Sequence, residues 1–215
     1  ILGETGAGKE LVARAIHQQS SRAGGPFIPD NVGGLPETML QSELFGHAKG
    51  AFTGAERDRD GKLATASGGT LLLDEVESIS TLAQVQLLRV LEDGLVTPLG
   101  ADKPVETDIR LLSTTKVDLQ EEVKKGNIRE DYYHRIAVLS IRVPALREHI
   151  DDVPLLVSRF MKRAAEHNEL PVPRVPERVL DAMIRYSWPG NVRELRNCVE
   201  RMVITARDGV AGPFD

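Results

Sequence analysis

Eight residues near the start of the chain have the types and spacing of a loop that holds phosphate groups. The stretch from Gly3 to Glu10 reads G-E-T-G-A-G-K-E and fits the first seven positions of the pattern G-x-x-x-x-G-K-[ST]. Its glycines allow a tight turn in which backbone N–H groups face one concavity, while Lys9 reaches the terminal phosphates. The alternative is a glycine-rich turn with a chance lysine. We predict a nucleoside triphosphate site formed by Gly3, Glu4, Thr5, Gly6, Ala7, Gly8, Lys9 and Glu10.

A pair of carboxylates could complete this chemistry. Glu10 occupies the position at which a Ser or Thr hydroxyl normally contacts Mg²⁺, so the metal must be held from elsewhere. The apolar run 71–73 ends in Asp74 and Glu75 and resembles a Walker B element, a buried strand whose C-terminal end faces the phosphate loop. We expect Asp74 to hold Mg²⁺ and Glu75 to polarise the attacking water. The alternative is a strand followed by an acidic turn.

The elements that must position these residues alternate between helix and strand patterns. Helical spacing predicts helices over residues 10–20, after Pro36 and over 79–93, and apolar runs predict strands from Phe27, over 109–115 and over 138–143. This order is typical of an α/β protein with a parallel sheet. The apolar side predicted for the helix over 79–93 contains Leu82, Val85, Leu87 or Leu88, and Leu91.

Beyond Pro144 the pattern is purely helical. A helix over 153–167 has Leu156, Phe160 and Ala164 on one side. Pro176 has the position of a first-turn proline, and Asn191 with Glu194 fits a capping box before the last helix. These signals mark helix starts. The sequence therefore predicts a small all-helical domain after the α/β part.

The composition describes an ordinary globular protein. Of the 215 residues, 41% are apolar and 27% are charged, and the formal net charge is −5. This charge argues against a main surface that grips nucleic acid. Cys198 is the single cysteine, so we expect a small buried side chain rather than a disulfide. With no apolar run long enough to span a membrane, we expect a cytoplasmic protein. The chain begins at Ile1, and we expect it to be a fragment whose first strand is cut short.

A glycine-rich loop follows the second predicted helix. Glycines at 46, 50 and 54 disfavour a helix there, and Phe52 is an apolar residue that contacts either a partner or the core. Its sequence Gly50-Ala51-Phe52-Thr53-Gly54-Ala55 is identical to the GAFTGA signature of the AAA+ activators of sigma-54 RNA polymerase, the bacterial enhancer-binding proteins. The family's phosphate loop also ends in Gly-Lys-Glu. The resemblance covers essentially the whole chain and implies that residues 50–55 contact sigma-54.

The resemblance also implies roles for residues that would otherwise read as solvated charges. The segment 128–136 resembles the family's FREDLYYRL, so Arg129 and Arg135 are implied arginine fingers that act on a neighbouring subunit's ATP. The segment 188–195 matches the family's second sensor, with Arg193 directed at the γ-phosphate. Thr115 lies at the first sensor. Asn31 matches the asparagine that hydrogen-bonds the Walker B glutamate, here Glu75.

The chain departs from the family pattern at several positions. Lys116 replaces the usual asparagine after the first sensor and could pair with phosphate or be solvated. Asp30 and Val32 replace an apolar residue and a cysteine beside Asn31, and Ala48 replaces a glutamate. Residues 116–119 and 97–100 are most similar to the C4-dicarboxylate transport regulators within the family. The segment 95–106 resembles a second family loop that flanks the first.

The resemblance implies an α/β P-loop AAA+ core over 1–146, a helical lid over 147–208 and the start of a linker over 209–215. It implies ATP and Mg²⁺ as cofactors, a hexameric ring, and ATP hydrolysis that remodels the sigma-54 RNA polymerase closed promoter complex. Enhancer DNA would be bound only through a domain absent from this chain, and no membrane is involved. The alternatives are an AAA+ ATPase with another client and a module that holds nucleotide without turnover.

Overall fold

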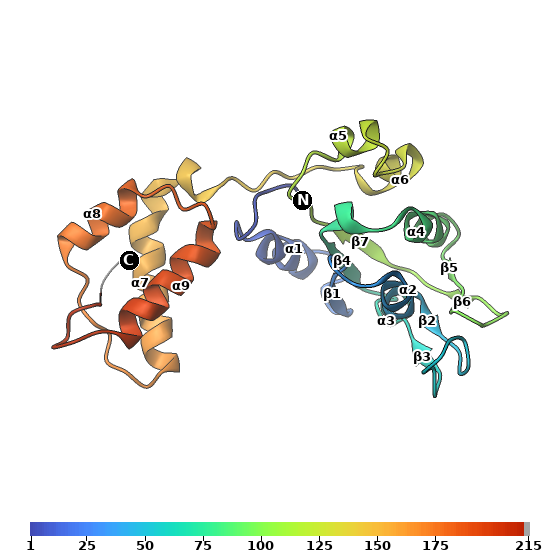
Figure 1. The fold of residues 1–215 in the computed structure, drawn as a ribbon, viewed down its shortest axis with the longest axis horizontal. Coiled ribbons are helices and arrows are strands. Elements are labelled where there is room, and N and C mark those ends of the chain that lie inside the picture. Colours follow the sequence, from blue (N-terminus) through green and yellow to red (C-terminus); the bar gives the residue numbers. More distant parts are fainter. Residues whose placement is uncertain (213–215) are drawn as a thin grey trace. The chain divides into compact units, whose positions relative to one another are not determined.

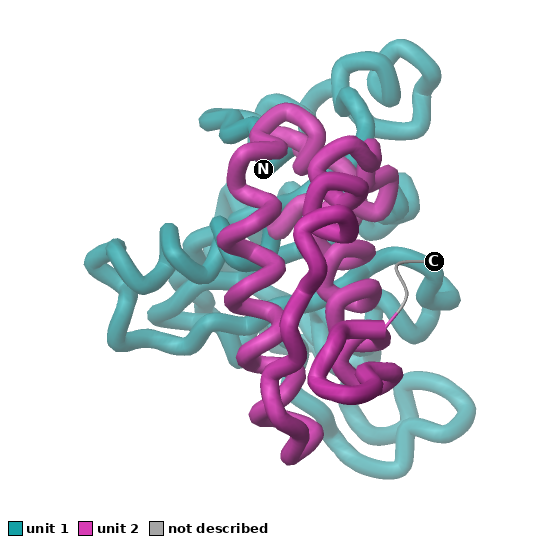
Figure 2. Tube along the Cα trace, turned by 90° about the vertical axis from the view of Figure 1, so that its left-hand side faces the viewer, with its two compact units in different colours: residues 1–2, 9–142 teal, residues 3–8, 143–215 magenta. Residues whose placement is uncertain are grey.

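A computed structural model describes residues 1–212 of the chain. The last three residues of the predicted linker, 213–215, lie outside the described residues. The chain divides into two compact units, coloured teal and magenta in Figure 2. Unit 1 contains residues 1–2 and 9–142, and unit 2 contains residues 3–8 and 143–215. Most of the predicted phosphate loop is therefore grouped with the C-terminal part of the chain.

Unit 1 is built on a parallel sheet of order β1-β4-β7 (Figure 1). Strand β1 (Phe27–Asn31) pairs with β4 (Thr70–Asp74), and β4 pairs with β7 (Arg110–Ser113). The central strand β4 is the most buried, because Leu71, Leu72 and Leu73 are at most 1% exposed. Parallel strands covered on both faces carry such uninterrupted apolar runs. The predicted α/β class is confirmed.

Two strand predictions need correction. The predicted strand over 109–115 is shorter, and its four residues, Arg110–Ser113, are half-buried. The predicted strand over 138–143 is reduced to one bridge, in which Leu2 pairs with Arg142 while also bridging Thr115. A strand needs a partner backbone along its length. In the described part of the chain, the backbone partner of residues 138–143 is Leu2, whose N–H donates to the Ile141 carbonyl at 2.8 Å.

Unit 1 also contains six α-helices. They are α1 (Lys9–Gln18), α2 (Glu37–Phe45), α3 (Lys62–Thr65), α4 (Thr81–Asp93), α5 (Leu119–Lys124) and α6 (Glu130–Ile136), and a 3₁₀ turn η1 (Val76–Ser78) follows β4. Helix α4 begins after Ser80, whose hydroxyl accepts from the Ala83 N–H, and ends at Gly94 in the left-handed conformation.

The predicted apolar side of α4 is partly wrong. Leu82 is 56% exposed, whereas the buried row is Ala83, Leu87 and Val90 together with Gln84. Gln84 is buried because its side-chain amide donates to the Ile79 carbonyl at 3.0 Å and to the Asn127 carbonyl at 2.9 Å. A helix face predicted from the spacing of apolar residues does not include a buried polar residue such as Gln84.

Two short antiparallel hairpins extend from unit 1. One pairs β2 (Gly46–His47) with β3 (Arg59–Asp60), and the other pairs β5 (Leu95–Val96) with β6 (Val105–Glu106). The GAFTGA segment connects the strands of the first hairpin. The second hairpin contains the predicted flanking loop.

Unit 2 is helical. The short turns η2 (Leu146–Glu148) and η3 (Ile150–Asp152) lead into α7 (Val153–His167), α8 (Glu177–Arg185) and α9 (Asn191–Ile204), and α7 packs on α9 (Figure 1). Trp188, Leu195 and Cys198 lie in its core. The predicted row Leu156, Phe160 and Ala164 is half-buried, and the fully buried row lies one residue further along: Val153, Val157, Met161 and Ala165. The first-turn proline is found in α7, whereas Pro176 precedes α8 as its N-cap residue.

Candidate functional site

Two glycines of the predicted phosphate loop are required by its backbone. Gly6 and Gly8 have φ of 79° and 99°, in the left-handed region that side chains disfavour. A Cβ atom on Gly6 would also lie 2.3 Å from the carbonyl oxygen of Gly190. No residue larger than glycine fits at position 6 without displacing this segment of unit 2.

The loop is tied to η2 and to the second-sensor segment of unit 2 by charged and buried groups. The Arg147 guanidinium donates to both carboxylate oxygens of Glu4, at 2.5 and 2.8 Å, and this pairing raises the pKa of Arg147 above its ordinary value. The Asn191 side-chain amide donates to the Glu4 carboxylate and to the Thr5 carbonyl, both at 3.1 Å. The Asn191 side-chain oxygen accepts from the Leu146 N–H at 2.8 Å. Asn191 is fully buried and joins three segments.

The predicted capping box of Asn191 and Glu194 is therefore only half correct. Glu194 accepts from the backbone N–H of Gly190 at 2.7 Å, as such a carboxylate should. Asn191, however, is the first residue of α9 rather than its cap, and its side chain makes the contacts to Leu146, Glu4 and Thr5 described above. The predicted helix start is therefore right, but the sequence pattern does not contain the partners of the Asn191 side chain, which are remote in sequence.

Arg193 lies in the first turn of α9 with an exposed side chain. Its backbone N–H donates to the carbonyl of Gly6 at 3.3 Å. With Thr5 and Gly190 it lines an open pocket of about 620 Å³. The predicted sensor arginine and the predicted phosphate loop thus share one pocket of unit 2.

Lys9 opens α1 in unit 1 and lies among three carboxylates. Its partial burial lowers the pKa of Lys9, while the charges of Asp74, Glu77 and Glu75 oppose that shift by favouring the ammonium. Lys116 adds a smaller contribution that lowers the pKa. The carboxylates predicted for metal and water chemistry are therefore close enough to Lys9 to act on it electrostatically.

Asp74 ends β4 and is held by neighbouring strands. Asn31 is its register partner on β1, and the Asn31 amide donates to Oδ2 of Asp74 at 3.3 Å. The Thr114 hydroxyl, just beyond β7, donates to Oδ1. Thr114 was not predicted, and its position one residue before Thr115 was the only signal for it. Both contacts orient the carboxylate.

The donor chemistry at Asp74 fits Mg²⁺. This ion prefers hard oxygen ligands and is usually bound by one or two carboxylates with substrate phosphates and water. Among residues 1–212 no group of three or more His, Cys, Asp or Glu side chains could form an all-protein metal cage. Glu10 is occupied elsewhere, because its carboxylate pairs with Arg14 of the next helical turn at 2.7 Å. The residues present therefore fit a metal that would be bound by Asp74 together with the phosphates of a nucleotide.

Glu75 has a strained backbone. Its φ and ψ are 61° and 49°, an uncommon conformation for a residue with a side chain. A Cβ on Gly33 would lie 2.6 Å from Oε2 of Glu75, so this carboxylate packs against the Gly33 backbone. The expected hydrogen bond from Asn31 to Glu75 is not formed, since the Asn31 amide donates to Asp74 and its oxygen accepts from the Gly33 N–H at 2.8 Å. The ammonium of Lys116 lies 3.4 Å from Oε2 instead.

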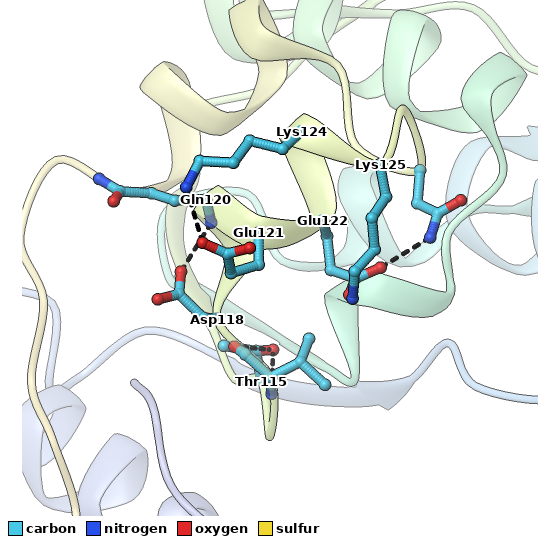
Figure 3. Close-up of polar contacts among 9 residues, drawn as sticks. Thr115, Asp118, Gln120, Glu121, Glu122, Lys124 and Lys125 are labelled. Carbon is cyan, nitrogen blue, oxygen red and sulfur yellow. Dashed lines mark hydrogen bonds and ion pairs between the residues drawn. The ribbon is translucent and has the colours of Figure 1, made fainter.

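Thr115 has local partners. Its hydroxyl donates to the Val117 carbonyl at 3.1 Å, and the same oxygen accepts from the Val117 N–H at 3.2 Å. Figure 3 shows Thr115 below α5, whose N-cap Asp118 accepts from the Gln120 N–H at 2.8 Å. Thr115 is 6% exposed. In this structure Thr114, not Thr115, contacts the Walker B carboxylate.

The two predicted arginine fingers lie at opposite ends of α6 with exposed side chains. Arg129 pairs with Asp131 through contacts of 2.6 and 3.0 Å, which raises the pKa of Arg129. The Arg135 guanidinium donates to the carbonyl of Leu91. Gln84 supports this region, because its side-chain oxygen accepts from the Arg129 N–H at 2.9 Å. Sequence reasoning missed Gln84.

The GAFTGA segment forms a closed loop. The Gly50 N–H donates to the Ala55 carbonyl at 2.8 Å, and Gly50 and Gly54 have φ of 83° and 101°. Phe52 is 39% exposed, and its ring stands edge-on to His47 with centroids 4.9 Å apart. Phe52 is therefore neither free in solvent nor part of the core.

The predicted flanking loop lies beside the GAFTGA loop. The Ala48 N–H donates to the Leu99 carbonyl at 2.8 Å, and the Leu99 N–H donates to Gly46 at 2.9 Å. A Cβ on Gly100 would lie 2.8 Å from the Cβ of Ala51. The two loops are thus joined through their backbones.

The departures beside Asn31 have structural partners. Asp30 is 6% exposed and forms an ion pair with Lys62, whose ammonium is also 3.6 Å from Glu43. Val32 is 1% exposed and belongs to the main core of unit 1. A buried charge is tolerated where a partner is available.

Together these features define a class of protein. A parallel sheet follows a phosphate loop, its central strand ends in Asp74 and Glu75, and a helical lid carries an arginine beside the loop. This is the AAA+ ATPase fold. Residues 1–142 match the family described as the Sigma-54 interaction domain, and residues 147–214 match the AAA+ ATPase lid domain.

Similar sequences and a similar solved structure come from transcriptional regulators and from a protein solved with ATP. The transcriptional regulatory protein ZraR of Salmonella typhimurium is 47% identical over 204 residues, which are 95% of this chain and 46% of that protein. The C4-dicarboxylate transport transcriptional regulatory protein DctD of Rhizobium meliloti is 46% identical over 213 residues, 99% of this chain and 46% of DctD. The crystal structure of NtrX from Brucella abortus in complex with ATP has a TM-score of 0.89 and 40% identity, covering 96% of this chain and 45% of that one.

The chain belongs to the sigma-54 interaction domain family. It spans less than half the length of the curated relatives that it matches. The predicted family and fold are confirmed, and the C4-dicarboxylate transport regulators are among the relatives. No helix within residues 1–212 is long and apolar enough to cross a membrane.

Proposed function

We propose that this chain is the ATP-hydrolysing domain of a transcriptional activator that acts on sigma-54 RNA polymerase. The observation that carries the proposal is the family match over residues 1–142 together with an intact GAFTGA loop on its own hairpin. Nucleotide binding is supported by NtrX, which was solved with ATP and with ADP. Hydrolysis would move the GAFTGA loop against sigma-54 and remodel the closed promoter complex.

We assign the phosphate chemistry to the residues described above. The amides of residues 3–8 and the ammonium of Lys9 bind the phosphates of ATP, and Asp74 holds Mg²⁺. When bound there, the metal would neutralise charge on the phosphates. Glu75 orients and polarises the attacking water, which is a role for a carboxylate close to, but separate from, the metal ligand.

Three further residues report on the bound nucleotide in this proposal. Arg193 is directed at the γ-phosphate, and its place beside Thr5 in one pocket supports this role. Thr115 acts as the first sensor. Asn31 holds Glu75 off line in one state of the cycle, and its present bond to Asp74 keeps its amide within the same group of side chains.

The arginine fingers imply assembly. Arg129 and Arg135 would stabilise charge on the phosphoryl group of a neighbouring subunit, because a guanidinium is always charged and presents planar donors. Their exposure on α6 is compatible with action on another chain. We therefore propose a ring, hexameric as the family resemblance implies, with a core over 1–146, a lid over 147–208 and a linker from 209. Enhancer DNA would be bound by a domain outside this chain.

The test is ATP hydrolysis per chain measured across a wide range of protein concentration. We expect the rate per chain to rise with concentration, because each active site needs a neighbour, and to fall to background in Arg135→Ala. Glu75→Gln should also abolish turnover while ATP binding persists.

A rate at background at every concentration, with ATP still bound, would show a module that holds nucleotide without turnover. Turnover without capture of sigma-54 in a pull-down would indicate an AAA+ ATPase with another client. Lys124→Gln, which removes a surface ion pair with Glu121 on α5, is the matched control for folding and assembly.

A further inference from the structure

Lys116 lies between two carboxylates. Its ammonium is 3.4 Å from Oε2 of Glu75 and 4.0 Å from Oε1 of Glu77. The side chains of Lys116 and Glu75 are 43% and 32% exposed, whereas that of Glu77 is 10% exposed. A small shift of the flexible Lys116 side chain would therefore change its nearest partner from Glu75 to the more buried Glu77.

The Glu77 carboxylate is buried and has no hydrogen bond to the described part of the chain. Neither of its side-chain oxygens is accessible to solvent, and neither has a hydrogen-bond partner within residues 1–212. An ionised carboxylate left without hydrogen bonds in the protein interior is unfavourable unless a positive charge compensates it. Lys116 is one such charge, and Lys9 is another that acts on Glu77.

Glu75 is restrained by the same lysine. Its Oε2 packs against Gly33 and faces the Lys116 ammonium, while Asn31 is engaged with Asp74. An ammonium 3.4 Å from a carboxylate that already packs against a backbone holds that carboxylate in one orientation. This restraint opposes the role that the proposed function gives to Glu75, because the carboxylate must turn toward the attacking water.

We propose that Lys116 is a positioning residue that restrains Glu75 through an ion pair. When Glu75 is released for hydrolysis, Lys116 forms its ion pair with Glu77 instead. The inference rests on the proposed function, because it assumes that Glu75 activates water. It explains two features of this chain together: a lysine after the first sensor and a buried carboxylate two residues after Glu75.

The experiment is a double-mutant cycle on the intact, assembled protein, with kcat and KM for ATP measured for each variant. Lys116→Gln should raise kcat about two- to fivefold, the size expected for removing one partly exposed ion pair. Glu77→Gln should lower kcat, since Lys116 then has only Glu75 as a partner. Lys116→Arg should behave like the parent because it keeps the charge.

The coupling between the two positions is the decisive result. In the Lys116→Gln background, Glu77→Gln should no longer lower kcat, because the lysine that it redirects is gone. Binding of a fluorescent ATP analogue should be little changed by Lys116→Gln. Lys124→Gln, which removes the 2.7 Å pair with Glu121, should leave kcat unchanged.

Other outcomes overturn the inference. A lower kcat with weaker analogue binding in Lys116→Gln would make the lysine a phosphate ligand, and an unchanged kcat would make the pair incidental. Equal losses from Glu77→Gln in both backgrounds would show that Glu77 acts through Lys9 instead. Failure of the proposed function gives a different pattern, in which the parent protein shows no turnover that depends on Glu75.

Discussion

At the scale of single residues, Asn191 shows how a buried amide can organise a binding loop. It bonds the Leu146 backbone, the Glu4 carboxylate and the Thr5 carbonyl, and its φ of 53° is one that asparagine tolerates better than alanine. We expect Asn191→Ala to lower the free energy of unfolding of unit 2 by roughly 2–4 kcal/mol, from unpaired polar groups and backbone strain. Urea unfolding followed by the fluorescence of Trp188, the single tryptophan, measures this unit.

Two comparisons separate the causes. Asn191→Gly removes the same hydrogen bonds without the penalty at positive φ, so it should cost less than Asn191→Ala. Asn197→Ala changes an exposed asparagine of the same helix and should change the free energy by less than about 0.5 kcal/mol. If Asn191→Ala and Asn197→Ala were equally mild, the side chain of Asn191 would not hold the loop.

The sequence could predict the residues whose local pattern carries the chemistry. Spacing pointed to residues 3–9, and an apolar run followed by two carboxylates, together with the family resemblance, pointed to Asp74 and Glu75. It did not reveal Thr114, Gln84 or the true partners of Asn191. Each of these acts through a backbone or side chain that is 40 or more positions away. Such contacts depend on the register of the sheet and the packing of helices, which no local pattern contains.

At the scale of elements, β1 is joined to α3 by a buried ion pair. Asp30 is 5% exposed in its side chain and Lys62 is 31% exposed. Lys62→Met should destabilise unit 1 by about 2–4 kcal/mol, below the loss for a fully buried pair because water still reaches the lysine. Amide hydrogen exchange of β1 and β4 would measure the change.

The matching variants make this prediction specific. Replacing both partners, Asp30→Leu with Lys62→Met, should recover most of the loss, because no buried charge then remains unpaired. Lys124→Met removes the exposed pair with Glu121 and should cost less than about 1 kcal/mol. Equal protection of β1 in all three variants would mean that the Asp30–Lys62 pair does not stabilise this edge of the sheet.

The elements that were predicted well have strong local signals. The buried run of β4 and the helical period of α9 are each contained within a few residues. The strand over 138–143 failed because extended backbone forms a strand only when a partner backbone lies beside it. The apolar side of α4 was misplaced because Gln84, a polar residue, occupies its buried face.

At the scale of the whole molecule, the proposed action of the arginine fingers on a neighbouring subunit would allow two inactive variants to complement each other. Lys9→Ala should lose phosphate binding and Arg135→Ala should lose the finger, so each alone should be inactive. In mixed rings, an intact Lys9 on one chain can meet an intact Arg135 on the next. We expect the mixture to regain measurable ATP hydrolysis.

The matching control mixes Lys9→Ala with Glu75→Gln, two defects that both belong to the nucleotide-binding side of one chain's site. Each chain of this mixture still offers a finger, but neither has a complete catalytic set, so no recovery is expected. Recovery in the control mixture, or none in the first mixture, would contradict action of Arg135 across a subunit interface.

The grouping of residues 3–8 with the lid bears on how such proteins can be recombined. Glu4, Thr5 and Gly6 are bonded to Arg147, Asn191 and the backbone of Arg193, although about 140 or more positions separate them in the chain. In a chimaera that exchanges the C-terminal segment between relatives, the Arg147–Glu4 pair would persist only if the incoming segment carried the matching arginine, so residues 3–8 should be exchanged together with that segment. Residues 3–8 and the C-terminal segment form one structural unit that is discontinuous in the sequence. A crossover point chosen from the linear sequence alone would divide this unit.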